Sequence, residues 1–401
     1  MTIEDEMPIK LFQCLFISIC LTANAGINDF DPQSTPGLTS PQIQQGWLSL
    51  FDGKSFFGWR VPTTEQWEVK EGTLIANEGE IEIIRTACQF DDFELSLEYR
   101  CHRDTNSGVF IRSSPFPKNP KTDCFEINIA PQSSPFPTGS IVGHIKADSV
   151  AIHDDWNRMR IVADGSNISV WINGQKANQW VAEGRYPKKG YIGLQHNSGQ
   201  IRFRNIAVRP LHLGPLWSEQ GLSSWTTKSK MQSEFQLSQR GILSVKGGRG
   251  QIETKQTYRD FVFTSHIRTN QSGLNSGVFF RCIPGDLMNG YESQIQNEVV
   301  NDNPTQPRDC GTGGIFRRFN ARYVNSKDEA WFSKTIIADG ATIGIWVNGL
   351  QVTDWTDQRK PHPNPRKGRR LDAGTIIFQG HDPTTDLSFK NAQIRELSTR
   401  N

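Results

Sequence analysis

Short stretches in which apolar and polar residues alternate recur along almost the whole chain, and turn residues separate them. Examples are FELSLEYR (residues 93–100), MRIVA (159–163), ISVWIN (168–173) and IRFRNIAV (201–208). Alternation with a period of two is typical of β-strands that bury one face, and none of these stretches keeps a helical period. Asn-Gly pairs at 173–174 and 348–349 predict tight hairpin turns, because both positions accept a positive φ. The pattern therefore predicts an all-β protein made of sandwiches.

The pattern of strands restarts half-way along the chain. Trp156, Trp171 and Trp180 return with one constant lag as Trp331, Trp346 and Trp355. The segments NSGVFIR (106–112) and FEINI (125–129) return as NSGVFFR (275–281) and YESQI (291–295). A lag this regular indicates a tandem duplication. We therefore expect a first sandwich at residues 46–210, a linker at 211–216 and a second sandwich at 217–398.

The start of the chain has the features of an export signal. Lys10 precedes a mostly apolar stretch at residues 11–21, and Ala23-Asn24-Ala25 has the form of a cleavage site. The acidic residues at 4–6 do not fit a signal, and a start at Met7 would remove them. Residues 26–45 are rich in Pro, Ser, Thr and Gln and predict a flexible tether. We expect an exported protein, periplasmic, cell-surface or extracellular, without a membrane span after cleavage.

Composition narrows the classes of partner and cofactor. The 401-residue chain has a formal net charge of +2, and its main basic run, RKGRR at residues 366–370, is too short to predict nucleic-acid binding. Five cysteines follow residue 25, and this odd number leaves at least one thiol free or bonded to another molecule. No spacing of cysteine and histidine suggests zinc, and the sequence requires no cofactor.

Two neighbouring strands in each half carry the same set of polar and aromatic residues. In the second half the set is Asn275, Phe279, Arg281, Glu292 and Gln294. In the first half it is Asn106, Phe110, Arg112, Glu126 and Asn128. Alternation predicts that the arginine and the carboxylate share one face of a sheet. A plain cross-strand ion pair would also explain them, but the presence of the set in both halves favours a functional face.

Several motifs, taken in order, resemble the 3-keto-disaccharide hydrolase-like domain family. They are LFDGKSFFGW (residues 50–59), NSGVF-x-R, the acidic strand, and GYIGLQ followed by FRNI (190–195 and 203–206). The resemblance covers both halves and implies two tandem concanavalin A-like jelly-roll β-sandwiches, each with a concave sugar-binding face. It also implies cleavage or hydration of 3-keto-glycosides, which are sugars whose C3 hydroxyl has been oxidised, and so favours an enzyme.

The chemistry of such a sugar assigns roles to the residues. A ketone at C3 acidifies the C2 hydrogen, and its removal expels the C1 substituent, after which water can add; this needs a base and donors to the enolate oxygen. We assign Glu292 or His381 as base or acid, Arg281 as the cation and Asp382 as the partner of His381. Further candidates for substrate binding are Asn275, Phe279, Tyr291, Gln294, Gln379, Asn106, Phe110, Arg112, Glu126, Asn128 and His196.

The second half matches the family pattern better, and alternatives stay open. It has Tyr291-Glu292-Ser293-Gln294 and a Gln379-Gly380-His381-Asp382 loop, whereas the first half has no acid beside His196. A divalent cation held by Asp382 and Glu292 could polarise the ketone, although no spacing demands one. Duplication also suits a non-catalytic tandem carbohydrate-binding module, because two weak sites on one chain gain avidity. A structural sandwich without a sugar site is a third alternative.

Overall fold

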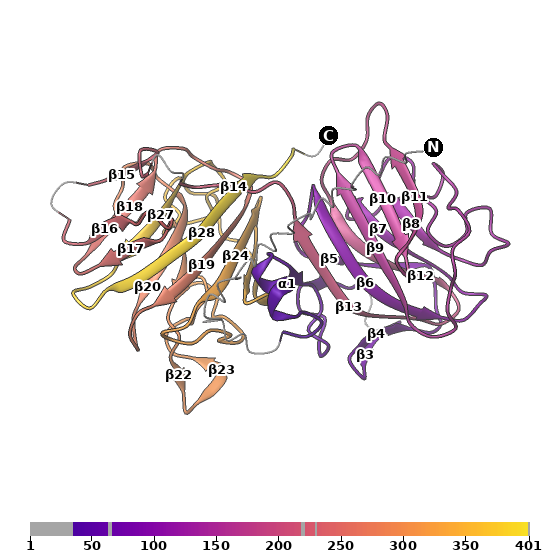
Figure 1. The fold of residues 1–401 in the computed structure, drawn as a ribbon, viewed down its shortest axis with the longest axis horizontal. Helices are drawn as coiled ribbons and strands as arrows, with labels where there is room; N and C mark the ends of the chain where they lie inside the picture. Colours follow the sequence, from indigo (N-terminus) through magenta and orange to yellow (C-terminus); the bar gives the residue numbers. More distant parts are fainter. Residues whose placement is uncertain (1–34, 63–65, 218–220, 229–230, 400–401) are drawn as a thin grey trace, which may run out of the picture.

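The computed structural model describes residues 35–62, 66–217, 221–228 and 231–399, and each half of the chain forms a β-sandwich (Figure 1). The predicted export signal at residues 1–25 lies outside the described residues. No helix in the described ranges is both long enough and apolar enough to cross a membrane.

The first sandwich packs an eight-stranded sheet against a five-stranded one, and neighbouring strands pair antiparallel. The larger sheet contains, in spatial order, β11 (Gln175–Val181), β10 (Asn167–Ile172), β9 (Asn157–Asp164), β6 (Phe93–Cys101), β13 (Ile201–Pro210), β4 (Thr73–Ala76) and β3 (Trp67–Lys70), with β1 (Leu48–Ser49) paired to β13. The smaller sheet contains β2 (Trp59–Arg60), β5 (Glu82–Thr86), β12 (Tyr191–Ser198), β7 (Asn106–Ser113) and β8 (Phe125–Ile129). Leu95, Ile161 and Leu194 are among the fully buried residues between the sheets.

The second sandwich repeats this strand order. Its larger sheet contains β16 (Glu234–Leu237), β17 (Leu243–Lys246), β28 (Asp386–Glu396), β19 (Phe261–Thr269), β24 (Phe332–Asp339), β25 (Thr342–Val347) and β26 (Leu350–Thr356), with β14 (Gly214–Pro215) paired to β28. The smaller sheet contains β15 (Trp225–Thr227), β18 (Gly250–Thr254), β27 (Thr375–Gly380), β20 (Ser276–Cys282) and β21 (Tyr291–Ile295). A separate hairpin pairs β22 (Val299–Val300) with β23 (Asn303–Pro307). The prediction of an all-β fold with two jelly-roll sandwiches is confirmed.

The two sandwiches share one apolar cluster. Val262, Ile337 and Trp346 of the second sandwich belong to the same buried cluster as the first sandwich's core. The indole Nε1 of Trp346 donates to the carbonyl of Ser49 at 2.9 Å. Lys189 and Asp339 form an ion pair of 2.8 Å across the boundary, and both side chains are only 7% exposed. The sandwiches therefore pack against each other through buried apolar, hydrogen-bonded and charged contacts.

Residues 35–45 are not a tether, which corrects the sequence prediction for this part. They contain the helix α1 (Ser40–Gln44), which lies between the sandwiches in Figure 1. The backbone NH of Thr39 donates to Gln42 Oε1 at 2.9 Å, which satisfies an amide before the first turn. Thr35 and Ile43 are each 2% exposed, and Thr35 donates to the Asn348 carbonyl of the second sandwich. The polar composition of this segment gave no indication that Thr35 and Ile43 are buried.

Candidate functional site

The outer face of the smaller sheet in the second sandwich brings together four of the predicted residues. Phe279 pairs directly with Glu292, and Gly277 pairs with Gln294. Ile377 pairs with Phe279 from the other side, so that Gln379, two residues later in β27, also points outward. Gly277 sets the position of the carboxyl group, because a Cβ there would lie 2.8 Å from Glu292 Oε1 and would push that side chain aside. The missing side chain leaves room for the carboxyl group.

A small cleft of about 120 Å³ opens at Glu292. Phe279, the turn at residues 315–318, Pro365 and Arg366 contribute to its walls. Burial raises the pKa of Glu292 to about 7, and the nearby cations, of which Arg366 acts most strongly, oppose that shift without cancelling it. A carboxyl group with a pKa near neutrality can both accept and return a proton at physiological pH.

Two amide side chains flank Gly277 beside this carboxyl. Gln294 Nε2 donates to Asn275 Oδ1 at 2.9 Å, and Gln379 Nε2 donates to Met288 Sδ at 3.2 Å. The Oε1 atoms of both glutamines are buried and have no donor among the described residues. Gln294 is 1% exposed and Gln379 is 6% exposed, so these oxygens lie beneath the surface of the face and do not line the cleft.

Arg281 does not face Glu292, which corrects the prediction from alternation. It has a positive φ of 49°, and the pairing of β20 with β27 shifts register between Phe279 and Cys282. The register shift is a β-bulge, in which β20 has an extra residue. The bulge turns the arginine away from Glu292, and Cys282 lies beside Phe279 and Ile377 instead. Strict alternation fails because the strand contains this bulge.

The arginine of each copy ties the two sheets of its sandwich together. Arg281 donates to Arg259 O at 2.7 Å, Gly340 O at 2.6 Å and Asp260 Oδ1 at 2.8 Å. Arg112 donates to Asp91 O at 2.7 Å, Gly165 O at 2.7 Å and Asp92 Oδ1 at 2.8 Å. Both side chains are 1% exposed. These buried, fully engaged guanidinium groups are structural, and the expectation that Arg112 binds substrate is wrong on this geometry.

His381 and Asp382 lie beyond the end of β27, away from Glu292. His381 follows Ile377 by four residues, or about 13 Å of strand, and Ile377 is in the same cross-strand row as Glu292. His381 Nδ1 is 2.8 Å from Asp382 Oδ2, and the backbone NH of Thr384 donates to Asp382 Oδ1 at 2.8 Å. The structure therefore does not bring this pair to Glu292, either as acid–base partners or as joint ligands of a divalent cation.

Two other predicted substrate-binding residues lie inside the sandwiches. Tyr291 borders the cleft but is 3% exposed, and its hydroxyl donates to Asp357 Oδ2 at 2.8 Å. His196 is 1% exposed, and its Nδ1 lies 2.9 Å from Gln66 Nε2. Both are on the core side of their strands, which corrects the expectation that they face a sugar.

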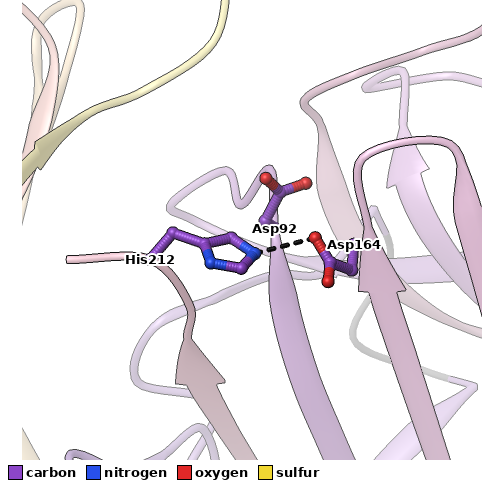
Figure 2. A group of neighbouring side chains, drawn as sticks. All are labelled: Asp92, Asp164 and His212. Atoms are coloured by element: carbon purple, nitrogen blue, oxygen red, sulfur yellow. Dashed lines mark hydrogen bonds and ion pairs between the residues drawn. The ribbon is translucent and has the colours of Figure 1, made fainter.

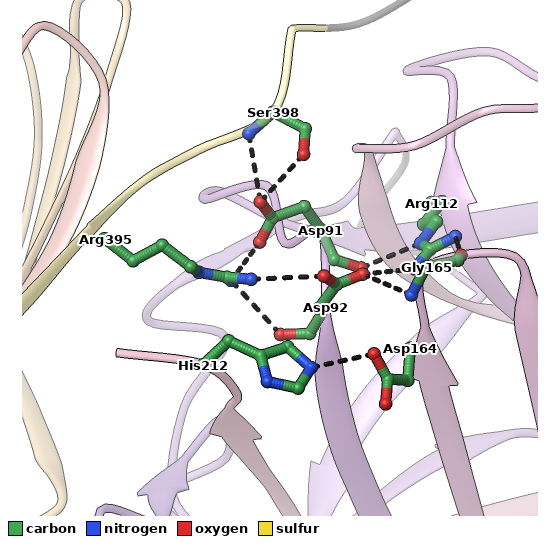
Figure 3. A network of polar contacts seen from close by, with 8 residues as sticks. All are labelled: Asp91, Asp92, Arg112, Asp164, Gly165, His212, Arg395 and Ser398. Atoms are coloured by element: carbon green, nitrogen blue, oxygen red, sulfur yellow. Dashed lines mark hydrogen bonds and ion pairs between the residues drawn. The ribbon is translucent and has the colours of Figure 1, made fainter. Parts of the chain in front are cut away.

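One group of potential metal ligands lies near the boundary between the sandwiches. Within the described chain, Asp92, Asp164 and His212 each place a ligand atom within 4.8 Å of the others (Figure 2). Figure 3 shows that Arg112 and Arg395 already approach Asp92 from two sides, at 2.8 and 3.3 Å. His212 Nε2 is 2.7 Å from Asp164 Oδ1. Two guanidinium groups beside the carboxylate make this an ion-pair network and a poor cation site.

The sequence comparison decides the family. The model of the 3-keto-alpha-glucoside-1,2-lyase-like domain matches residues 46–209 and again residues 214–395. The chain belongs to this family.

Known relatives of these two lyase-like domains include one curated protein. It is a 3-keto-disaccharide hydrolase of Bacteroides thetaiotaomicron, 23% identical over 241 residues, with 43% of this chain and 81% of that protein covered. Two solved structures of proposed glycosyl hydrolases from Parabacteroides distasonis also align. One is 19% identical with a TM-score of 0.40 and covers 44% of this chain and 98% of its own. The other is 30% identical with a TM-score of 0.36 and covers 41% of this chain and 99% of its own.

The first lyase-like domain repeats the outer face of the second. Glu126 lies over Gly108 as Glu292 lies over Gly277, and burial raises the pKa of Glu126 to about 7. Phe110 pairs with Glu126, and Asn128 and Gln195 flank Gly108 from its two neighbouring strands. The side-chain oxygens of Asn128 and Gln195 are buried without a donor among the described residues. Asn106 opens the same strand and is half-buried.

The lyase-like domains differ in the cations around their carboxyl groups. Turn residues Phe316 and Val142 occupy the same position, since each donates its backbone NH to the carbonyl of the site glutamate, Glu292 or Glu126. The next two residues are Arg317 and Arg318 in the second domain but Gly143 and His144 in the first. These arginines, with Arg366 from the basic run, were missed by the sequence analysis. The sequence does contain a signal for them, because only the second repeat has two arginines directly after this turn position.

A larger cavity, of about 840 Å³, is lined by residues of the first lyase-like domain. Tyr99, His102 and His153 contribute to its lining, together with the ion pair Arg103–Asp154. None of the predicted site residues lines it. This cavity is separate from the Glu126 face and was also missed by the sequence analysis.

Proposed function

We propose that the second domain is a hydrolase or lyase that acts on 3-keto-glycosides, with Glu292 as its base. The observation that carries the proposal is the half-buried Glu292 carboxyl group, whose pKa burial raises to about 7. It stands in a cleft on the outer face of the smaller sheet, beside the buried Phe279 ring and close to three arginine side chains that also line the cleft. Membership of the lyase-like family and the named relative supply the substrate class.

In the proposed reaction the Glu292 carboxylate takes the C2 proton, and the electron pair of the C–H bond forms the enolate of the C3 ketone. The enolate then collapses, the C1–O bond breaks, and the leaving oxygen takes a proton from the carboxyl group or from water. Addition of water at C1 gives net hydrolysis. Arg366, whose charge acts most strongly among the cations near Glu292, replaces Arg281 as the residue that faces the enolate.

A matched pair of variants tests the proposal. The purified protein is incubated with 3-keto-glycosides and their unoxidised parents, and the products are identified by mass spectrometry. We expect release of the aglycone from the keto-sugars alone, loss of that release in Glu292→Gln, and its retention in Glu126→Gln. Normal turnover by a folded Glu292→Gln protein would remove Glu292 as the base.

A second candidate function is carbohydrate binding without turnover by both domains. It is favoured by the first domain, which keeps the buried amide oxygens and the carboxyl group but has Gly143 and His144 where the second has arginines. The half-buried carboxyl group of Glu126 can accept hydrogen bonds from hydroxyl groups, and no arginine follows in the turn to stabilise an enolate. Binding of a glycan by both domains, with no conversion of any keto-sugar, would select this function over the first.

We also propose that the protein is exported after cleavage behind Ala25, on the sequence features of residues 1–25 alone. Amino-terminal sequencing of the protein recovered from outside the cytoplasm should begin at Gly26. Recovery of a chain that retains residues 1–25 would reject export by this signal.

A further inference from the structure

The cleft at Glu292 carries more positive charge than its surroundings balance. Arg317, Arg318 and Arg366 all line it, and none of them forms an ion pair with a carboxylate of a described residue. Arg318 donates to the carbonyl of Arg317 at 3.0 Å and to that of Arg366 at 2.8 Å. Arg366 in turn donates to the carbonyl of Met288. These bonds fix the loops that carry the three arginines around the cleft.

Arg317 is the arginine whose guanidinium has no bonded partner in the described part of the chain. Arg317 and Glu292 both line the cleft, and the charge of Arg317 lowers the pKa of Glu292, although burial, the larger effect, raises it. The guanidinium carbon lies 5.0 Å from the centre of the Phe316 ring, which is an adjacent wall of the cleft. An unpaired guanidinium beside a cleft is available to a ligand.

The backbone at Arg317 gives a second and independent indication. Its φ is +56°, a conformation disfavoured for residues with a Cβ, and the equivalent residue of the first domain is Gly143 with φ +77°. Both turns have the same hydrogen bonds, because Arg318 and His144 donate their backbone NH to Ile315 and Ile141. The fold therefore accommodates glycine here, and the second domain has arginine despite the strain. Because glycine adopts this φ without strain, the turn itself does not require an arginine at this position.

The other charged groups near Glu292 also leave an excess of positive charge at the cleft. Lys334, beneath the strand, adds partial positive charge, because burial lowers its pKa to about 7, and Asp309 is the acidic group that opposes the cations. The Lys334 Nζ donates to the carbonyls of Ser293 and Gln294 at 3.2 and 2.6 Å. A ligand with a negative group would balance this surplus, and the guanidinium fork matches the geometry of a planar or tetrahedral oxyanion.

We propose that the sugar bound at Glu292 carries a compact oxyanion, the carboxylate of a uronic acid or a sulfate ester, and that Arg317 binds it with help from Arg318 and Arg366. This inference rests on the proposed function, because it takes the cleft to be the sugar site. The first domain, with Gly143 at the same position, is expected to show no such preference.

Calorimetric titration of the whole protein with three probes tests the inference: methyl glucoside, methyl glucuronide and methyl glucoside 6-sulfate. We expect at least one charged probe to bind about tenfold or more tightly than the neutral one, and the two charged probes distinguish carboxylate from sulfate. In Arg317→Gly this preference should disappear while the melting temperature is kept or raised. Arg240→Gln, which removes an exposed arginine between β16 and β17, should keep the preference.

Equal binding of the charged and neutral probes, no binding of the charged probes, or an unchanged preference in Arg317→Gly would each overturn the inference. Turnover of a neutral 3-keto-glucoside is measured in parallel on the unmodified protein. Turnover without a charge preference rejects the inference and leaves the proposed enzyme standing. A charge preference in a protein that converts no keto-sugar rejects the catalysis and supports recognition of the oxyanion.

Discussion

The guanidinium of Arg281 lies 2.8 Å from the carboxylate of Asp260, and the same pair recurs in the first sandwich as Arg112 and Asp92. Asp260 Oδ1 also accepts the backbone NH of Gly340, and Asp92 Oδ1 that of Gly165. Each pair therefore joins a strand of the smaller sheet to a hairpin turn of the larger one. The recurrence of this arginine in both copies therefore reflects a contact that holds the two sheets together, and it is not evidence of a shared function.

We predict that Arg281→Met destabilises the protein by about 3–5 kcal/mol, since it leaves the Asp260 carboxylate without its buried cation. Denaturant unfolding measures the loss. Arg281→Lys should recover only part of it, because an ammonium group cannot make all three fixed contacts. Unchanged stability together with lost turnover would instead make Arg281 catalytic.

Alternation and repetition were sufficient to predict the strands and the duplication, but not the orientation of Arg281. Period-two patterns such as ISVWIN are strands in the structure, because each buries one face. The same rule failed between Phe279 and Cys282, where a bulge turns Arg281 toward the larger sheet. A single residue with positive φ changes the face, and the letters NSGVFFR do not reveal it.

Only those residues of the candidate site that lie on strands could be predicted from the sequence. Phe279, Glu292 and Gln294 share a face because neighbouring strands are in register, which alternation anticipates. Arg317 and Arg366 come from a turn and a loop, where no period relates sequence to direction. Their approach to Glu292 depends on contacts between distant segments, such as the bond from Arg318 to the carbonyl of Arg366.

Activity on 3-keto-glycosides should rise with pH through about 7, because the proposed base must be ionised and burial holds the pKa of Glu292 near that value. Burial has the largest effect on this pKa and raises it, and the charge of Asp309 adds to the rise. The positive charges of Arg366, Lys334 and Arg317 oppose it. The dependence of kcat/KM on pH measures it. Glu126→Gln should leave the midpoint unchanged, and a rate that is flat between pH 5 and 9 would contradict the assignment.

The two site carboxyl groups should also make stability depend on pH. Burial raises the pKa of Glu126 and Glu292 from 4.5 to about 7, so the folded state holds protons that the unfolded state releases. Their stabilising contribution is complete below pH 4.5 and is lost as pH rises through about 7. His266, whose pKa burial lowers to about 4, acts in the opposite direction, so a difference measurement is needed.

That measurement compares the melting temperature of the unmodified protein with that of the double variant Glu126→Gln/Glu292→Gln. Relative to the variant, the unmodified protein should lose a few degrees between pH 4.5 and 7.5. A constant difference across this range would mean that neither carboxyl group is held neutral by the fold.

The packing of the two sandwiches predicts unequal roles for two equivalent tryptophans. Trp346 is 1% exposed at the boundary, where its Nε1 donates to Ser49 O, whereas Trp171 is half-buried beneath Arg160, 4.2 Å from its ring centre. Trp346→Ala should therefore cost about 3–5 kcal/mol, and Trp171→Ala about 1 kcal/mol, since removal of a half-buried ring loses fewer contacts than removal of a buried one. Thermal and denaturant unfolding of both variants measure the difference. Similar losses in the two would show that the boundary contributes little, and the sandwiches would then be expected to unfold in separate transitions.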